Sequence, residues 1–137
     1  MSDSTPESSV ALRILVYSDN AKTRERVIRA LGKHLHPDLP ELTYLEVATA
    51  PMVVRQMDEG GIDLAILDGE ATPTGGMGIA KQLKDELATC PPILVLTGRP
   101  DDAWLANWSR AEAAVPHPID PIVLGRTVLG LLRTPTR

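Results

Sequence analysis

The sequence contains no phenylalanine and only one cysteine, Cys90, among its 137 residues. A single cysteine cannot form an internal disulfide bond, which favours a reducing compartment, and we expect the protein in the cytoplasm. Because aromatic residues make up only 3% of the chain, the core must be built from aliphatic side chains and methionine.

Excess basic charge and long apolar runs are also missing. The formal net charge is −4 at pH 7 and the pI is about 5.3, whereas a protein that binds nucleic acid through phosphates needs a basic surface. No apolar run approaches the roughly 20 residues that cross a bilayer. The polar, acidic start MSDSTPESS is unlike a secretory signal. We therefore expect neither nucleic acid nor a membrane as a partner.

The length is that of one ordinary domain. Residues 1–10 are mostly Ser, Asp, Glu and Pro with little to bury, which predicts a mobile leader. We expect the folded domain to span residues 11–133 and a short tail to follow at 134–137.

Short apolar segments alternate along the chain with segments of helical periodicity. The first helix is expected to run through Leu31 and Leu35 up to His36-Pro37, and the last begins at Asp120-Pro121 with a capping aspartate and a first-turn proline. Strands are expected at 12–17, 43–47, 62–67, 93–96 and 113–115, and the other helices at 51–59, at 79–87 and from Pro100 onward.

Strict alternation of strands and helices is typical of a parallel sheet with helices on both faces. The most apolar strands, at 12–17, 62–67 and 93–96, belong in the middle of such a sheet, and the two weaker strands belong at its edges. The sequence therefore predicts a doubly wound α/β fold with a five-stranded sheet in the order 2-1-3-4-5.

In a sheet of this kind, ligands bind beyond the carboxyl ends of the strands where the strand order reverses. Asp19 follows the first strand, Asp68 ends the third and Thr97 ends the fourth. We therefore expect two carboxylates and a hydroxyl to meet there. Because nearby carboxylates repel each other, a hard cation such as Mg²⁺ would neutralise them.

These motifs, in this order, resemble those of the receiver domains of response regulators. The resemblance rests on Ser18-Asp19-Asn20 after the first strand, Asp68 at the end of the third, and Gly76 eight residues later. It continues with Leu96-Thr97-Gly98 and with His117-Pro118 after the fifth strand, and it covers about residues 11–133.

The resemblance implies a flavodoxin-like receiver in two-component signalling. Asp68 would accept a phosphoryl group from a histidine kinase or a small phosphodonor, and Thr97 would contact that group and shift in response. Asp19, Asp68 and the backbone carbonyl of Glu70 would hold Mg²⁺. The peptide bond between His117 and Pro118 would be cis. Such a domain is a signalling module, so we expect no enzyme.

Three positions depart from the family pattern. Ser18 replaces the first of two acids, which should weaken a Mg²⁺ site. His117 replaces a lysine as the contact to the phosphoryl group, and Ala114 replaces the aromatic switch residue. Two hypotheses stay open: an atypical receiver with Asp68 as phosphoacceptor, and a pseudo-receiver adaptor that works without phosphorylation.

A different class of protein is a weaker alternative. The segment from Asp68 to Thr72 also resembles the nucleophile motif of haloacid-dehalogenase-like phosphatases, but Glu70 replaces the second aspartate of that motif. No later strand ends in the paired acids that would complete the metal site of such a phosphatase.

The output of a receiver that has no attached effector domain, as we expect here, must come from binding another protein. Trp104 and Trp108 are candidates for that contact because they share one face of the expected fourth helix and tryptophan is enriched at interfaces. The alternative is that both rings pack against the sheet.

Overall fold

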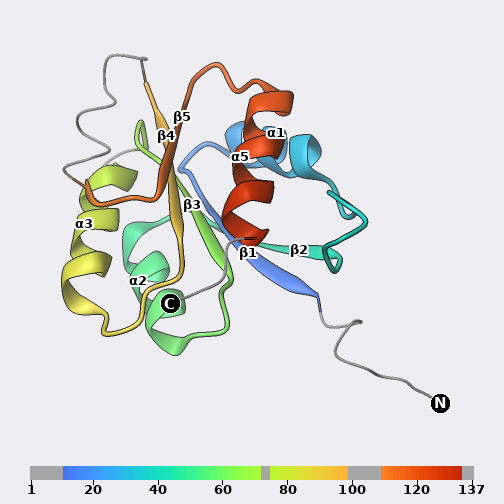
Figure 1. The fold of residues 1–137 in the computed structure, drawn as a ribbon. Helices are drawn as coiled ribbons and strands as arrows, with labels where there is room; N and C mark the ends of the chain where they lie inside the picture. The colour runs from blue at the N-terminus through green and yellow to red at the C-terminus, as the bar shows by residue number, and fades with distance from the viewer. Residues whose placement is uncertain (1–10, 72–74, 99–108, 134–137) are drawn as a thin grey trace.

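The computed structural model describes residues 11–71, 75–98 and 109–133 (Figure 1). Within them strands and helices alternate along most of the chain. They are, in chain order, β1 (Leu12–Tyr17), α1 (Ala21–Leu31), β2 (Leu42–Val47), α2 (Ala50–Glu59), β3 (Leu64–Asp68), α3 (Gly76–Glu86), β4 (Ile93–Thr97), β5 (Ala113–Pro116) and α5 (Pro121–Arg133).

The strands form one parallel sheet in the order β2-β1-β3-β4-β5, as the sequence predicts. Every residue of β3 and β4 is buried, whereas the edge strands β2 and β5 are buried at only some positions. Because both faces of a parallel sheet are covered, central strands are apolar throughout and edge strands are not.

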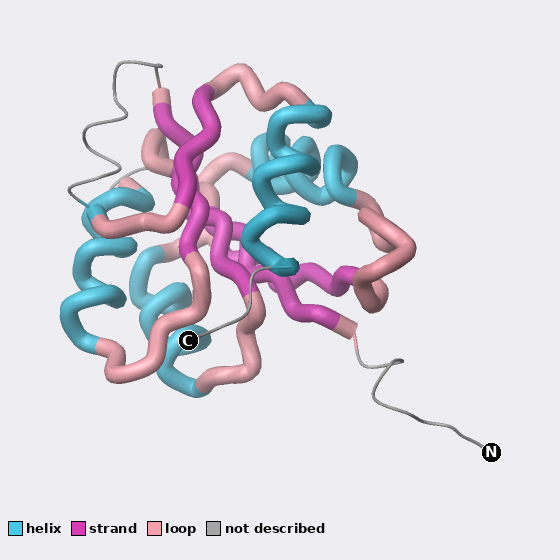
Figure 2. Tube along the Cα trace, viewed as in Figure 1, coloured by secondary structure: helices cyan, strands magenta, loops and turns pink. Residues whose placement is uncertain are grey.

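Helices cover the two faces of the sheet in pairs, α1 with α5 on one face and α2 with α3 on the other (Figures 1 and 2). Each pair closes its own aliphatic core against the sheet. Leu83 of α3 packs with Ile93 and Val95 on one face, and Leu124 of α5 packs with Leu94 and Leu96 on the other. Aliphatic side chains therefore supply the buried apolar volume that phenylalanine supplies in other cores.

The expected end of the first helix is wrong. The helix α1 ends at Leu31, because Gly32 adopts φ of 67°, a left-handed conformation that glycine tolerates and other residues avoid. Leu35, which we expected inside the helix, still packs against the core on the α1 and α5 face, but from the loop that follows. Periodicity thus predicts the burial of Leu35 correctly and its secondary structure incorrectly.

The last helix begins as predicted. Asp120 Oδ1 accepts hydrogen bonds from the backbone N–H groups of Ile122 at 2.9 Å and Val123 at 3.4 Å, which satisfies donors that a helix start leaves free. The preceding peptide bond between His117 and Pro118 is cis, as the family resemblance implies.

Several expectations lie outside the described residues: the leader at 1–10, the helix from Pro100 with Trp104 and Trp108, and the tail at 134–137. Within the part that the structure describes, no helix combines the length and the apolar character needed to cross a membrane.

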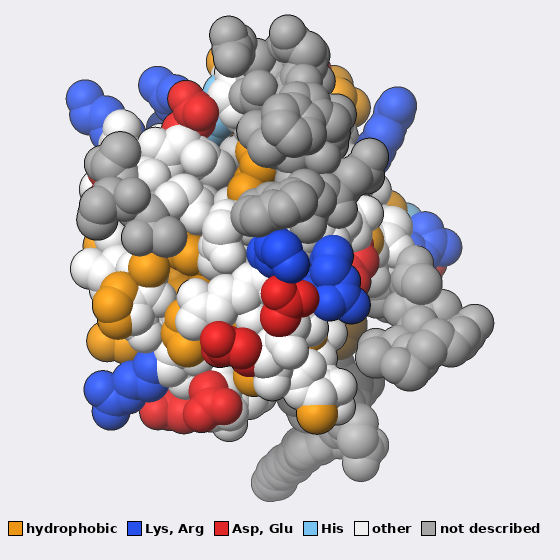
Figure 3. Space-filling view, turned by 90° about the vertical axis from the view of Figure 1, so that its left-hand side faces the viewer, with side chains coloured by type: hydrophobic (Ala, Val, Ile, Leu, Met, Phe, Trp, Pro, Cys, Tyr) orange, Lys and Arg blue, Asp and Glu red, His pale blue; other side chains and the backbone are white. Residues whose placement is uncertain are grey.

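On the α3 side of the molecule, basic and acidic side chains lie next to one another (Figure 3). Asp85 pairs with Lys81 at 2.9 Å and with Arg110 at 3.0 Å. Glu112 pairs with Lys84, and its other oxygen accepts the N–H of Ile93 at 2.7 Å. These contacts connect α3 to the segment that enters β5 and to the start of β4.

Candidate phosphoacceptor site

The carboxyl ends of β1, β3 and β5 meet around one open cavity of about 360 Å³. Because all strands are parallel, the segments that follow them emerge at the same edge of the sheet, where the strand order reverses between β1 and β3. The cavity is lined by Asp19, Asn20, Thr23, Asp68, Glu70 and His117. Four of the predicted site residues, Asp19, Asp68, Glu70 and His117, are thus brought together.

Asp68 is the central group of this site. It ends β3, and only 3% of its surface is exposed. Its Oδ1 accepts the backbone N–H of Glu70 at 2.9 Å and lies 3.1 Å from His117 Nε2. Its Oδ2 accepts the Ser18 hydroxyl at 2.8 Å. Both carboxylate oxygens therefore have partners, as a buried charge requires.

Ser18 has a role that the sequence analysis missed. We expected it only as a missing acid, but its hydroxyl donates to Asp68 and accepts the backbone N–H of Asn20 at 3.0 Å. The side chain is fully buried. An acid in this position would face Asp68 as a like charge, whereas serine supplies a hydrogen-bond donor. The residue type was visible in the sequence, but its distance from Asp68 was not.

Tyr17, at the end of β1, is a second residue that sequence reasoning did not place near the site. Burial raises the pKa of the Tyr17 phenol, and the negative charges of Asp19 and Asp68 raise this pKa further, because all three disfavour the phenolate. Tyr17 is therefore close enough to Asp19 and Asp68 for their negative charges to act on its hydroxyl.

Thr97 ends β4 beside β3 and is 2% exposed, and it is not among the residues that line the cavity. Among the described residues, no hydrogen bond joins its hydroxyl to Asp68. Its carbonyl accepts the N–H of His117 at 2.8 Å. The backbone of Thr97 thus connects the end of β4 to His117, which lines the cavity.

Glu70 extends away from β3 toward β4. Its carboxylate lies against Gly98, so closely that a side chain at position 98 would collide with it. Among residues 11–71, 75–98 and 109–133, no group of three or more His, Cys, Asp and Glu side chains is arranged to hold a metal ion. A cation here would depend on the carboxylates of Asp19 and Asp68 and on backbone oxygen.

Ala114, at the position of the expected aromatic switch, lies on the edge strand β5 with its side chain exposed. Its backbone pairs in register with Val95 of β4. A methyl group has no ring to move between buried and exposed positions.

Two curated proteins with the same description are closely similar to this chain in sequence. The chain is 87% identical over 130 residues to an uncharacterized response regulatory protein of Mycobacterium tuberculosis strain H37Rv, and the match covers 95% of this chain and 98% of the relative. A protein of the same description from strain CDC 1551 matches equally well. No family model matches the sequence.

Solved structures share the fold at low sequence identity. The chemotaxis response regulator CheY4 of Vibrio cholerae matches with a TM-score of 0.71 at 19% identity, over 90% of this chain and all of that one. The BeF3-activated receiver domain of DrrB matches with a TM-score of 0.69 at 18% identity, over 91% of this chain and all of that one.

Proposed function

The chain belongs to the response regulators of two-component signalling, and on this premise we propose that it is an atypical receiver in which Asp68 accepts a phosphoryl group. The observation that carries the proposal is the position of Asp68, at the carboxyl end of a central strand and on an open cavity with Asp19 and His117. The donor would be a histidine kinase or a small phosphodonor.

The proposed chemistry needs one nucleophile and one leaving group. A carboxylate oxygen of Asp68 forms a bond to phosphorus while the bond from phosphorus to the donor breaks, and the donor keeps that electron pair. With acetyl phosphate the leaving group is acetate. His117, whose Nε2 lies 3.1 Å from Asp68 Oδ1, would donate to a phosphoryl oxygen. The buried Thr97 hydroxyl lies at the end of the adjacent strand and is the candidate second donor.

The residues present suit Mg²⁺, which prefers oxygen ligands and retains several waters. Asp19, Asp68 and the backbone carbonyl of Glu70 would hold the ion, and all three residues line the same cavity. When bound, Mg²⁺ supplies positive charge to the phosphoryl oxygens. Because Ser18 stands where the family has another acid, we expect weaker binding than in receivers with two acids there.

The output of this receiver would be the binding of another protein. We place the protein in the cytoplasm, where a histidine kinase could reach it. Trp104 and Trp108 remain the candidate contacts to the protein partner.

The test is direct modification of the purified protein. We expect incubation with Mg²⁺ and acetyl phosphate to add one phosphoryl group by intact mass, and beryllofluoride to shift NMR signals around the cavity. Asp68→Asn should abolish both effects with an unchanged circular dichroism spectrum. No adduct at high donor concentration would contradict the proposal. Turnover of a generic phosphate ester that depends on Asp68 would indicate a haloacid-dehalogenase-like phosphatase instead.

Two observations favour the pseudo-receiver adaptor as a second candidate. Both oxygens of Asp68 already have donors, and the position of the aromatic switch holds Ala114. In this case, Asp68 is a structural acceptor and the domain has one constitutive binding surface. Asp68→Asn would then leave partner binding intact, and beryllofluoride would produce no shifts.

A further inference from the structure

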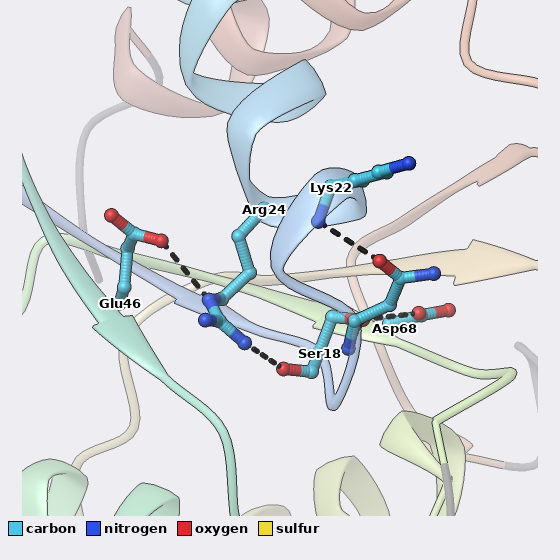
Figure 4. Close-up of polar contacts among 6 residues, drawn as sticks. Ser18, Lys22, Arg24, Glu46 and Asp68 are labelled. Carbon is cyan, nitrogen blue, oxygen red and sulfur yellow. Dashed lines mark hydrogen bonds and ion pairs between the residues drawn. The ribbon is translucent and has the colours of Figure 1, made fainter.

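Arg24 is a mostly buried arginine next to the site, and neither the sequence motifs nor the proposed chemistry assigns it a role. It lies in the first turns of α1, and its side chain is 16% exposed. Its Nη1 donates to the backbone carbonyl of Ser18 at 2.6 Å, and its Nε donates to Glu46 Oε1 at 3.0 Å (Figure 4). Arg29 on the same helix differs, because it is 80% exposed and pairs with Glu25 one turn away.

The two contacts of Arg24 connect three segments of the chain. Ser18 is in the loop after β1, Arg24 is on α1 and Glu46 is near the end of β2. A guanidinium group is planar and directs its N–H donors at fixed angles, so two simultaneous contacts fix its position better than one. Glu46 orients the guanidinium, which in turn holds the Ser18 carbonyl.

Ser18 is held at each of its polar groups. Its N–H donates to the carbonyl of Val47 at 3.2 Å, its carbonyl accepts from Arg24, and its hydroxyl accepts the N–H of Asn20. With the backbone fixed in this way, the hydroxyl proton has one remaining direction, toward Asp68 Oδ2. Figure 4 shows this continuous series of contacts from Glu46 through Arg24 and Ser18 to Asp68.

We infer that Arg24 is a positioning residue for the phosphoacceptor, acting through Ser18, with Glu46 holding Arg24 in place. The inference rests on the proposed function of Asp68. A carboxylate that attacks phosphorus must be held in one orientation, and small displacements are costly to such reactions. The Ser18 hydroxyl restrains one oxygen of Asp68, and Arg24 fixes the peptide group from which that hydroxyl projects.

The first experiment needs no phosphodonor. The side-chain carboxyl carbon of Asp68 is observed by carbon-detected NMR and assigned by its loss in Asp68→Asn. We expect Ser18→Ala and Arg24→Met to move this signal in the same direction. The matched control Arg29→Met, on the same helix, should leave it in place. An unmoved signal in Arg24→Met would overturn the inference, even if the protein is later found not to be phosphorylated.

The second experiment compares rates of phosphorylation by acetyl phosphate in a double-mutant cycle. We expect Arg24→Met to slow the reaction about three- to tenfold at saturating donor, as the loss of one hydrogen-bonding restraint would. In the Ser18→Ala background the same substitution should have no further effect. If the two effects multiply, Arg24 acts independently of Ser18 and the inference is wrong.

Two further variants keep the test decisive if Arg24→Met does not fold. Glu46→Gln keeps Arg24 but weakens its orientation, so we expect a smaller change in the same direction for both the NMR signal and the rate. Arg24→Lys retains one donor for the Ser18 carbonyl and should restore part of the rate. A wild-type protein that takes no phosphoryl group refutes the proposed function, while the NMR arm still decides the role of Arg24.

Discussion

His117 distinguishes this site from receivers that have a lysine at the same position. Its Nε2 lies 3.1 Å from Asp68 Oδ1, and its side chain is 24% exposed at the mouth of the cavity. An imidazole is shorter and less flexible than a lysine side chain, so it stays close to Asp68 and cannot extend far into the cavity. A lysine ammonium, by contrast, is a flexible point charge with three donors.

We therefore predict that His117→Lys increases the phosphorylated fraction. The lysine ammonium is fully charged at neutral pH, and its flexible side chain can bring it to a phosphoryl oxygen in several conformations. Its positive charge would then stabilise the negative charge that phosphorylation adds. Intact mass after incubation with acetyl phosphate and Mg²⁺ measures the fraction, and His117→Lys combined with Asp68→Asn is the control. An equal or smaller fraction in His117→Lys would show that the imidazole does not limit the reaction.

Glycine sets the distance between α3 and the strand that carries Asp68. A Cβ atom at Gly76 would lie 2.7 Å from the backbone carbonyl carbon of Leu67, nearer than real Cβ contacts allow. At Gly78, two residues further along the same helix, a Cβ would meet nothing within 4 Å. The start of α3 thus packs directly on β3 because position 76 has no side chain.

Gly76→Ala is expected to lower the free energy of unfolding by about 1–3 kcal/mol, because the helix must move off the strand. Gly78→Ala should raise it by up to about 1 kcal/mol, since alanine favours a helix and meets no obstacle. Urea denaturation of both variants measures the difference. Similar destabilisation by the two substitutions would show that close packing at Gly76 is not the cause.

The end of α1 depends on the edge strand β2. The Tyr44 hydroxyl donates a hydrogen bond to the carbonyl of Gly32, the residue that ends the helix. Burial raises the pKa of Tyr44 to about 12. In the unfolded chain this tyrosine would ionise near its ordinary pKa of about 10.

Stability should therefore fall between about pH 10 and pH 12 through Tyr44, because the unfolded state loses this proton before the folded state does. We predict that Tyr44→Phe loses about 1 kcal/mol at neutral pH, the usual value of one hydrogen bond. It should also show a shallower decline above pH 10. Denaturation midpoints of the two proteins across this range check both effects, and parallel curves would contradict the assignment to Tyr44.

The sheet serves as the common wall of two separate cores. Alternate residues of each central strand face opposite helix pairs, so Val95 belongs to the α2 and α3 core and its neighbours Leu94 and Leu96 belong to the other. Neither helix pair can be lost without exposing one face of β3 and β4. We therefore expect the two cores to unfold together.

Leu83→Ala in one core and Leu124→Ala in the other should each cost about 2–5 kcal/mol, since both side chains are almost fully buried. The test is a urea titration in which amide NMR signals from both cores are followed with circular dichroism. All signals should share one midpoint in each variant. Separate midpoints for the two cores would show that the sheet does not couple them.

Much of the fold could be predicted because apolar residues recur at different spacings in strands and in helices. The apolar runs of β3 and β4 require burial on both faces, which places them at the centre of the sheet and leads to the observed order. The predicted end of α1 was wrong, because Leu35 keeps the helical spacing after Gly32 has already turned the chain. Periodicity reports which side chains are buried, and it does not report the backbone that carries them.

The convergence of Asp19, Asp68 and His117 could be predicted from the sequence, because each lies at or just after the end of a strand and parallel strands end at one edge. The groups that surround Asp68 became visible only in the folded structure. Ser18 donates to Asp68, Arg24 holds Ser18 from α1, and Glu46 holds Arg24 from β2. These groups lie 2.6 to 3.0 Å apart and come from different segments of the chain, so no local pattern of residues specifies their contacts.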